Sequence, residues 1–129
     1  MSCSGVSRQD WILAIDDEFA ILDIVKTALE TEGHTVHTIS SPIEGIKFYE
    51  QHWTNIKLVL IDFMMPEMTG NLVFERLQRI NPDVRVLLLT GSFMFRKDEE
   101  FVRRLRGYLE KPINLDVLAV RVKDAIDSP

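Results

Sequence analysis

The sequence predicts an α/β fold in which one sheet of five parallel strands is covered by helices on both faces. Two observations lead to this prediction. Short apolar runs alternate five times with longer segments whose apolar residues recur at helical spacing. Several runs also end abruptly in an acidic or hydroxyl residue. Such β-α alternation gives a doubly wound parallel sheet, for which the common strand order is 2-1-3-4-5.

The five apolar runs are the expected strands. The third, Leu58–Ile61, is aliphatic throughout and is followed by Asp62 and a Met65-Pro66 turn, which is typical of a buried parallel strand. The other runs are rich in aliphatic or β-branched residues and are bounded by charged or turn-forming residues. We expect strands at Trp11–Ile15, Thr35–Ile39, Leu58–Ile61, Val84–Leu89 and Gly107–Glu110.

Capping residues mark the ends of the helices between these strands. Ser41 can cap a helix that has Pro42 at its first position and Glu44 in the place that completes a capping box. Gly33 can stop the preceding helix, and Asn114 can cap the last one. We expect helices over residues 19–32, from Pro42 to about His52, from Gly70 or Asn71 to Asn81-Pro82, over roughly Lys97–Arg106, and from Asn114 to about Ile126.

Composition limits the classes of protein that this chain can represent. Its 129 residues are enough for one core, so we expect a lead-in over residues 1–10 and one domain over residues 11–129. No apolar run approaches the roughly 20 residues of a membrane span. The start lacks the apolar segment of a secretory signal, and a lone cysteine, Cys3, excludes an internal disulfide. We therefore expect a cytoplasmic location, and the net charge of −5 argues against direct nucleic-acid binding.

Polar side chains stand at the ends of four of the expected strands. Carboxyl ends of parallel strands share one edge, where open α/β sheets bind ligands. With the order 2-1-3-4-5 these residues meet at that edge, with the carboxylates at the switch point between strands 1 and 3. The residues are Asp16 and Asp17 after strand 1, Asp62 after strand 3, Thr90 after strand 4 and Lys111 after strand 5.

Three carboxylates in one crevice repel each other, so the site must take up protons or bind a cation. Oxygen ligands without His or Cys suit Mg²⁺. With the metal screening its charge, a carboxylate can attack a phosphoryl group, for which Lys111 offers positive charge and Thr90 a hydroxyl donor. Each residue alone has an ordinary explanation as a helix cap, a turn former or a surface residue. The joint pattern favours a metal-assisted phosphoryl acceptor at Asp62.

These residues resemble the motifs of a response-regulator receiver domain of two-component signalling, which has a flavodoxin-like sheet and is similar to the chemotaxis regulator. The resemblance covers about Trp11 to Ile126. The matching motifs are the pair Asp16-Asp17, Asp62 in D-x-x-M-P followed by Met68 and Gly70, Thr90, and Tyr108-x-x-Lys111-Pro112.

The resemblance implies a role for each of these residues. Asp62 would accept phosphate from a phosphohistidine. Asp17, Asp62 and the carbonyl of Met64 would hold Mg²⁺, and Asp16 would act mostly through a metal-bound water. Lys111 and Thr90 would contact the phosphoryl oxygens. Thr90 would then move and Tyr108 would turn inward, repacking the face made by the fourth helix, fifth strand and fifth helix. The Lys111-Pro112 peptide is expected to be cis.

The same resemblance implies the partners of the chain. The phosphate donor would be a sensor histidine kinase or a phosphotransfer protein, and the output would be a change in protein binding. The target would be a downstream protein or a fused output domain, with a phosphorylation-dependent dimer as a further form. The chain would be free-standing or part of a longer regulator or hybrid kinase, and no membrane contact is expected.

Three alternatives compete with a phosphorylated switch. A Mg²⁺-dependent phosphatase with an aspartyl intermediate would place a second acid two residues after the nucleophile, where this chain has Met64. A flavodoxin-like cofactor binder would need a phosphate-cradling loop in place of the acidic residues 16–18. A pseudo-receiver would bind partners without phosphorylation. One further segment, Phe93-Met94-Phe95, is either buried locally or forms an apolar patch for a partner.

Overall fold

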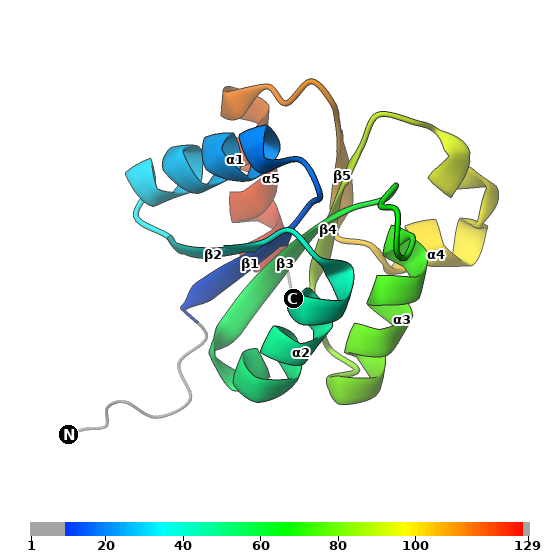
Figure 1. Ribbon diagram of the computed structural model, residues 1–129. Coiled ribbons are helices and arrows are strands. Elements are labelled where there is room, and N and C mark those ends of the chain that lie inside the picture. The colour runs from blue at the N-terminus through cyan, green and yellow to red at the C-terminus, as the bar shows by residue number, and fades with distance from the viewer. Residues whose placement is uncertain (1–9, 128–129) are drawn as a thin grey trace.

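The computed structural model describes residues 10–127 as a single five-stranded parallel sheet with helices on both faces (Figure 1). The strand order is β2-β1-β3-β4-β5, as predicted. The strands are β1 (Trp11–Ile15), β2 (Thr35–Ile39), β3 (Ile56–Asp62), β4 (Val86–Thr90) and β5 (Gly107–Glu110). The helices are α1 (Phe19–Thr31), α2 (Pro42–His52), α3 (Gly70–Ile80), α4 (Glu99–Arg104) and α5 (Leu115–Asp127), with 3₁₀ turns at Trp53–Asn55 and Met94–Lys97. Residues 1–9 of the predicted lead-in, which include Cys3, lie outside the described residues.

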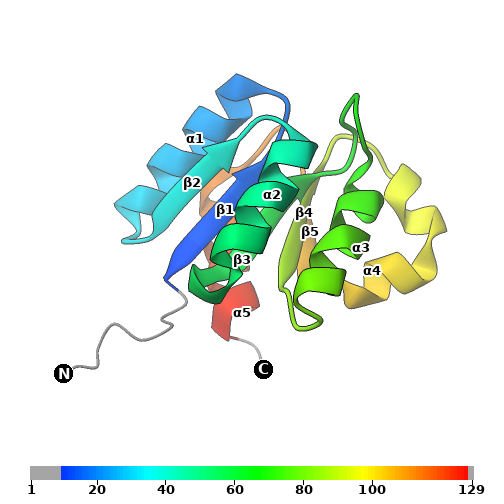
Figure 2. The ribbon, with the colours of Figure 1, turned by 60° about the horizontal axis from the view of Figure 1, so that its bottom comes forward.

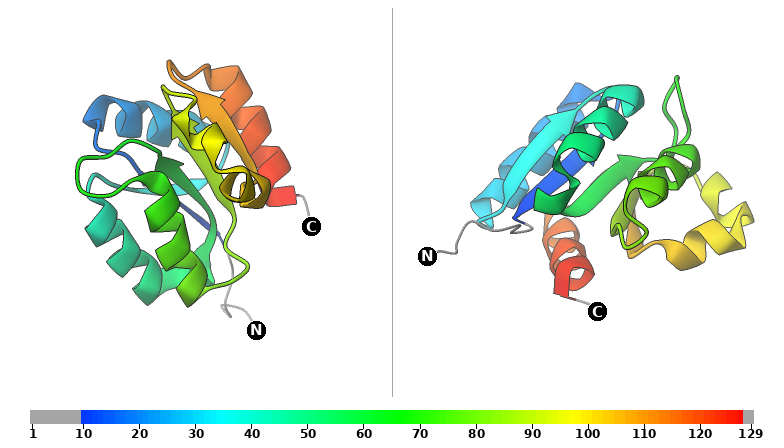
Figure 3. Two further views of the ribbon diagram at one scale, coloured as in Figure 1. Left: turned by 90° about the vertical axis from the view of Figure 1, so that its right-hand side faces the viewer. Right: turned by 90° about the horizontal axis from the view of Figure 1, so that it is seen from below.

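Side chains on the two faces of the sheet form two separate cores. Helices α1 and α5 cover one face, and α2, α3 and α4 cover the other (Figures 2 and 3). Alternation along β1 divides its residues between them: Ile12 and Ala14 pack toward α1 and α5, whereas Leu13 and Ile15 pack toward α2 and α3. Because the central strands are buried on both sides, they read as unbroken apolar runs in the sequence.

Three of the predicted residues at helix ends, Ser41, Asn114 and Gly33, act as expected. The hydroxyl of Ser41 accepts a hydrogen bond from the backbone N–H of Glu44 at 3.3 Å, with Pro42 at the first helical position of α2. Asn114 accepts hydrogen bonds from the N–H groups of Asp116 and Val117 at the start of α5. Gly33 follows α1 with φ of +95°, a conformation that glycine adopts without steric cost.

Two elements in the second half of the chain were predicted with the wrong bounds. Strand β4 begins at Val86 rather than Val84, because Val84 donates its N–H back to the carbonyl of Asn81 in the turn after α3. Helix α4 is shorter than the predicted Lys97–Arg106. Asp98 caps it by accepting from the N–H of Phe101 at 3.0 Å, which starts the helix at Glu99.

The segment Phe93-Met94-Phe95 is divided between the core and the surface, and its role as a partner patch stays a prediction. Phe95 is buried and joins the core under α3 and α4, whereas Phe93 and Met94 are each 56% exposed. The ring of Phe95 lies 6.1 Å from that of Phe63, the residue after Asp62, and 5.0 Å from that of Tyr108. Phe95 therefore connects the loop after β4 to both β3 and β5.

Gly70 brings the start of α3 close to the end of β3. Its N–H donates to the carbonyl of Phe63 at 2.7 Å. A Cβ atom at Gly70 would lie only 3.0 Å from the carbonyl oxygen of Asp62 and from the Cα of Phe63, so a side chain would meet backbone. The glycine thus lets the loop of residues 63–69 close tightly over the end of the strand that carries Asp62.

Candidate functional site

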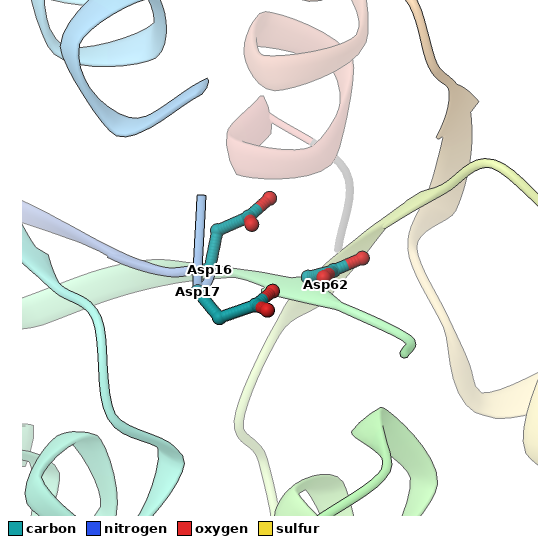
Figure 4. A group of neighbouring side chains, drawn as sticks. All are labelled: Asp16, Asp17 and Asp62. Atoms are coloured by element: carbon teal, nitrogen blue, oxygen red, sulfur yellow. The ribbon is translucent and has the colours of Figure 1, made fainter. Parts of the chain in front are cut away.

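Three carboxylates converge at the carboxyl edge of the sheet. Asp16 and Asp17 follow β1, and Asp62 is the last residue of β3, the neighbouring strand. One oxygen from each lies within 4.8 Å of the others, and Figure 4 shows the three side chains directed into the same space. The strand order decides this meeting, because β1 and β3 lie side by side although their paired residues Ile15 and Ile61 are 46 positions apart in the sequence.

Burial makes the charges in this cluster costly. Asp16 is 0% exposed and Asp62 is 4% exposed. Burial, with the charge of Asp16 adding to it, raises the pKa of Asp62 to about 7, although Lys111 opposes the shift. Burial likewise raises the pKa of Asp16, against a hydrogen bond of 2.9 Å from the N–H of Glu18. Folding thus forces together acidic groups that water would keep apart.

Lys111 supplies positive charge to the cluster from the end of β5. Its ammonium nitrogen lies 2.7 Å from Glu18, 2.9 Å from Asp16 and 3.4 Å from Asp62. Burial alone would lower the pKa of Lys111, but its bonds to Glu18 and Asp16 outweigh burial and hold that pKa above its usual value. The backbone N–H of Lys111 donates to the carbonyl of Thr90 at 2.8 Å, and the following peptide to Pro112 is cis, as predicted.

The oxygen donors of the cluster fit a hard divalent cation. Oδ2 of Asp16 is buried and accepts no hydrogen bond among the described residues, although the ammonium group of Lys111 lies 2.9 Å from it. One lysine does not neutralise three converging carboxylates, so a further cation would be stabilised there. Carboxylates without nitrogen or sulfur ligands match the preference of Mg²⁺, which keeps several waters beside one or two carboxylates.

Thr90 lies at the same edge, but its hydroxyl faces its own loop. The hydroxyl donates to the carbonyl of Ser92 at 2.6 Å and accepts from the N–H of Ser92 at 3.0 Å. These two bonds fill the donor and one acceptor position of the side chain, which is 1% exposed. Thr90 therefore lies at the same sheet edge as the acidic cluster, but in this conformation its hydroxyl is hydrogen-bonded to the backbone of Ser92.

Tyr108 lies two residues before Glu110, the partner of Thr90 in the β4–β5 pairing. Its hydroxyl is hydrogen-bonded to the guanidinium of Arg96. The guanidinium carbon of Arg96 also lies 4.9 Å from the ring centres of both Tyr108 and Phe93, which is a cation–π distance. Arg96 therefore links the 3₁₀ turn after β4 to the exposed side of β5.

Three contacts of the site were absent from the sequence prediction. Glu18 was interpreted there only as an acid before a helix, yet it is the nearest partner of Lys111. Ser92 and Arg96 also gave no sequence signal for their contacts with Thr90 and Tyr108. The structure brings the carboxylates of Asp16, Asp17 and Asp62 together, but their role as metal ligands, like that of the Met64 carbonyl, stays a prediction. The Met64 side chain is exposed beside the site.

Comparison with known proteins assigns this geometry to a family. A family model described as the response regulator receiver domain matches residues 12–123. The chain is 30% identical over 129 residues to the sensor kinase CckA of Brucella abortus (strain 2308), covering 96% of this chain and 13% of that protein. The chain spans between 13% and 50% of the length of the curated relatives compared with it.

Solved structures agree with this assignment. A receiver domain protein from Clostridium thermocellum has a TM-score of 0.83 and 31% identity, covering 91% of this chain and 94% of its own. The response regulator TrrA from Thermotoga maritima, solved in complex with Mg²⁺ and BeF, has a TM-score of 0.81 and 29% identity, covering 90% of this chain and 98% of its own. Within residues 10–127, no helix has the length and apolar character that a bilayer crossing needs.

Proposed function

The chain belongs to the response-regulator receiver domain family, whose general function is Mg²⁺-dependent phosphorylation on an aspartate, and from this premise we propose that Asp62 is its phosphoryl acceptor. One observation carries the proposal: Asp62 ends the central strand β3, where two further carboxylates and Lys111 converge on it. The family match covers most of the domain that we propose for residues 11–129, after a lead-in of residues 1–10.

The chemistry follows from the groups around Asp62. A carboxylate oxygen of Asp62 forms the new O–P bond while the P–N bond to a donor phosphohistidine breaks, and its electron pair stays on the imidazole nitrogen. Because burial raises the pKa of Asp62 to about 7, positive charge beside it is needed to keep the attacking carboxylate ionised. Lys111 provides part of that charge and is within reach of oxygens on an incoming phosphoryl group.

The acidic pair provides the place for the metal. Asp17, Asp62 and the carbonyl of Met64 would hold Mg²⁺, and Asp16 would act mostly through a water bound to it. When bound, Mg²⁺ neutralises charge on the phosphoryl oxygens and the carboxylates. Asp16 supports this assignment because its buried Oδ2 accepts no hydrogen bond among the described residues, and Glu18 fixes the other Asp16 oxygen by donating its N–H to it.

The domain is a signalling switch in this proposal and catalyses only its own phosphorylation and dephosphorylation. A turnover phosphatase of the aspartyl type would need a general acid two residues after the nucleophile. Met64 stands there, with an exposed apolar side chain that carries no proton to transfer. A flavodoxin-like phosphate cradle is opposed by the acidic pair after β1, which repels phosphate in the absence of a metal.

Phosphorylation changes protein binding through Thr90 and Tyr108. A phosphoryl group on Asp62 offers acceptor oxygens to the Thr90 hydroxyl, which must first leave its two bonds with Ser92. Releasing Ser92 frees the loop that leads to Phe93 and Arg96, and Arg96 holds the Tyr108 hydroxyl. The altered surface is made by α4, β5 and α5.

The partners follow from this mechanism. The donor is a sensor histidine kinase or a phosphotransfer protein, and the receiver acts on a downstream protein or a fused output domain, in one form as a phosphorylation-dependent dimer. Direct nucleic-acid binding has no support in the net charge of −5. Cytoplasmic histidine kinase domains would make the cytoplasm its location.

Intact mass after incubation with acetyl phosphate and Mg²⁺ tests the proposed acceptor. We expect one phosphoryl adduct on the wild-type protein and none on Asp62→Asn, whose amide is not a nucleophile. The neighbouring Asp17→Asn variant is the matched control, because it should slow phosphorylation through the metal without removing the acceptor. An adduct on Asp62→Asn would move the acceptor elsewhere, and a folded wild-type protein without an adduct would favour the pseudo-receiver alternative.

Thr90→Ala should separate phosphorylation from the response to it. The variant keeps Asp62 and Lys111, so it should still accept phosphate. It lacks the hydroxyl that couples the phosphoryl group to Ser92, so amide shifts of residues 92–97 and 108 should change several-fold less on phosphorylation. Thr90→Ser retains the hydroxyl and should respond like the wild type. A full response from Thr90→Ala would refute the proposed coupling.

A further inference from the structure

The nearest partner of Lys111 is an acid that the proposed chemistry leaves unused. Its ammonium nitrogen lies 2.7 Å from the carboxylate of Glu18 but 3.4 Å from Asp62, the proposed acceptor. The contact with Glu18 is also a hydrogen bond by its geometry. In the unphosphorylated protein, therefore, Lys111 is held more closely by the start of α1 than by the residue on which it acts.

We propose that Glu18 is a positioning residue that holds Lys111 in the unphosphorylated protein and releases it to the phosphoryl group on Asp62. This inference rests on the proposed function, because it concerns the lysine of that site. Glu18 touches neither substrate nor metal in the proposal. It acts through Lys111, by competing with the phosphoryl oxygens for one of the hydrogens of the ammonium group.

The contacts that Lys111 already makes set up this competition. An ammonium group has three N–H donors, and three carboxylates surround this one. A phosphoryl group brings additional negative charge and strong acceptor oxygens to Asp62. Because the ammonium nitrogen lies nearer to Glu18 and Asp16 than to Asp62, we expect its bond to Glu18 or its contact with Asp16 to lengthen when Lys111 turns toward those oxygens.

The difference in burial between Asp16 and Glu18 determines which of these two acids loses its contact with Lys111. Asp16 is fully buried, and removing its counter-charge would leave a charge without solvent. The side chain of Glu18 is 58% exposed, so water can replace the lysine at little cost. Glu18 is therefore the partner that Lys111 loses, while Asp16 keeps its ion pair.

The backbone of Glu18 is fixed, which makes its contact with Lys111 a built feature of the fold. Its N–H donates to Oδ1 of Asp16, and its carbonyl accepts from the N–H groups of Ile21 and Leu22 in the first turn of α1. The position from which the Glu18 side chain reaches Lys111, at the edge of the acidic cluster, is therefore fixed by the backbone.

Phosphorylation kinetics of Glu18→Gln test this role. With acetyl phosphate at saturating Mg²⁺, we expect the half-saturating donor concentration to fall about two- to fivefold, the range of a partly exposed ion pair, with a smaller change in the maximal rate. Glu110→Gln is the matched control, because Glu110 is exposed and immediately precedes Lys111. It removes the same charge and should stay near the wild-type value.

A second comparison isolates the route through Lys111. In a Lys111→Met background, Glu18→Gln should leave the half-saturating concentration unchanged, since the residue through which it acts is missing. Unfolding curves at the assay Mg²⁺ concentration establish that each variant is folded. The inference is overturned if Glu18→Gln matches Glu110→Gln, or if its effect persists without Lys111. If the wild-type protein forms no phosphoryl adduct, the proposed function is overturned as well. If the wild type forms its adduct but Glu18→Gln and Glu110→Gln have the same half-saturating donor concentration, only this inference is overturned.

Discussion

At pH 8 without divalent cations, the free energy of unfolding of Asp62→Asn should be about 2 to 4 kcal/mol higher than that of the wild-type protein. The wild-type carboxyl has a pKa of about 7 when folded and an ordinary value near 3.8 when unfolded. Between these values the folded protein keeps a proton that the unfolded chain has released. Wild-type stability therefore falls as the pH rises from about 4 to about 7. Asparagine is uncharged throughout and escapes this loss.

Urea unfolding at several pH values measures the effect. The difference between Asp62→Asn and wild type should be small at pH 4, grow to pH 7 and then level off. Asp23→Asn, which neutralises an exposed aspartate on α1, should show no such dependence. Adding Mg²⁺ should stabilise the wild type more than Asp62→Asn, because binding to the folded state alone raises its stability. Equal stability of the two proteins at pH 8 would mean that the acidic cluster is not destabilising.

Lys111→Met should act in the opposite direction and lower the free energy of unfolding at pH 8 by about 3 to 5 kcal/mol, the cost of removing one partner from a buried ion pair. The side chain of Lys111 is only 14% exposed and is in contact with two acids that are almost fully buried. Methionine preserves most of its apolar stem but leaves Asp16 and Asp62 facing each other. The pKa of Asp62 should then rise above about 7, so the loss should shrink at pH 5, where that group is protonated in both proteins.

Combining the two substitutions tests their shared origin. Asp62→Asn in the Lys111→Met background should recover a larger free energy than it gains in the wild type, because the unpaired carboxylate is then the main defect. Lys123→Met, at an exposed position on α5, should leave stability within about 0.5 kcal/mol of wild type. If Lys111→Met is as stable as the wild type at pH 8, the ion pairs of Lys111 do not offset the repulsion.

These opposite effects describe a site that is suited to binding at the expense of stability. Charges that the fold holds together in a buried crevice are compensated only in part by Lys111. A cation or a phosphorylation event would change the balance of charge there, and we expect the neighbouring loops to respond because Thr90 and Lys111 make hydrogen bonds and ion pairs at that edge.

The sequence by itself determined the fold class and the residues of the acidic cluster, and the strand order was inferred from the order common to that fold class. Period and capping signals depend on neighbours in the chain, so β1, β2 and α2 were predicted with their observed bounds. The residues at the strand ends could be brought together in advance because parallel strands share one carboxyl edge. The boundaries near residues 84–106 were less predictable. There the hydrogen bond between Val84 and Asn81 and the Asp98 cap fix where β4 and α4 begin, and the apolar pattern of the sequence does not show either of them.

Only the tertiary structure decided how the site residues are partnered. Glu18 and Lys111 are 93 positions apart, and their 2.7 Å contact exists because β1 and β5 end at the same edge. The hydroxyl of Thr90 faces Ser92, and Arg96 holds Tyr108, through geometry that no spacing along the chain encodes. Side-chain direction and burial, and with them the raised pKa of Asp62, arise when distant segments pack together and exclude water.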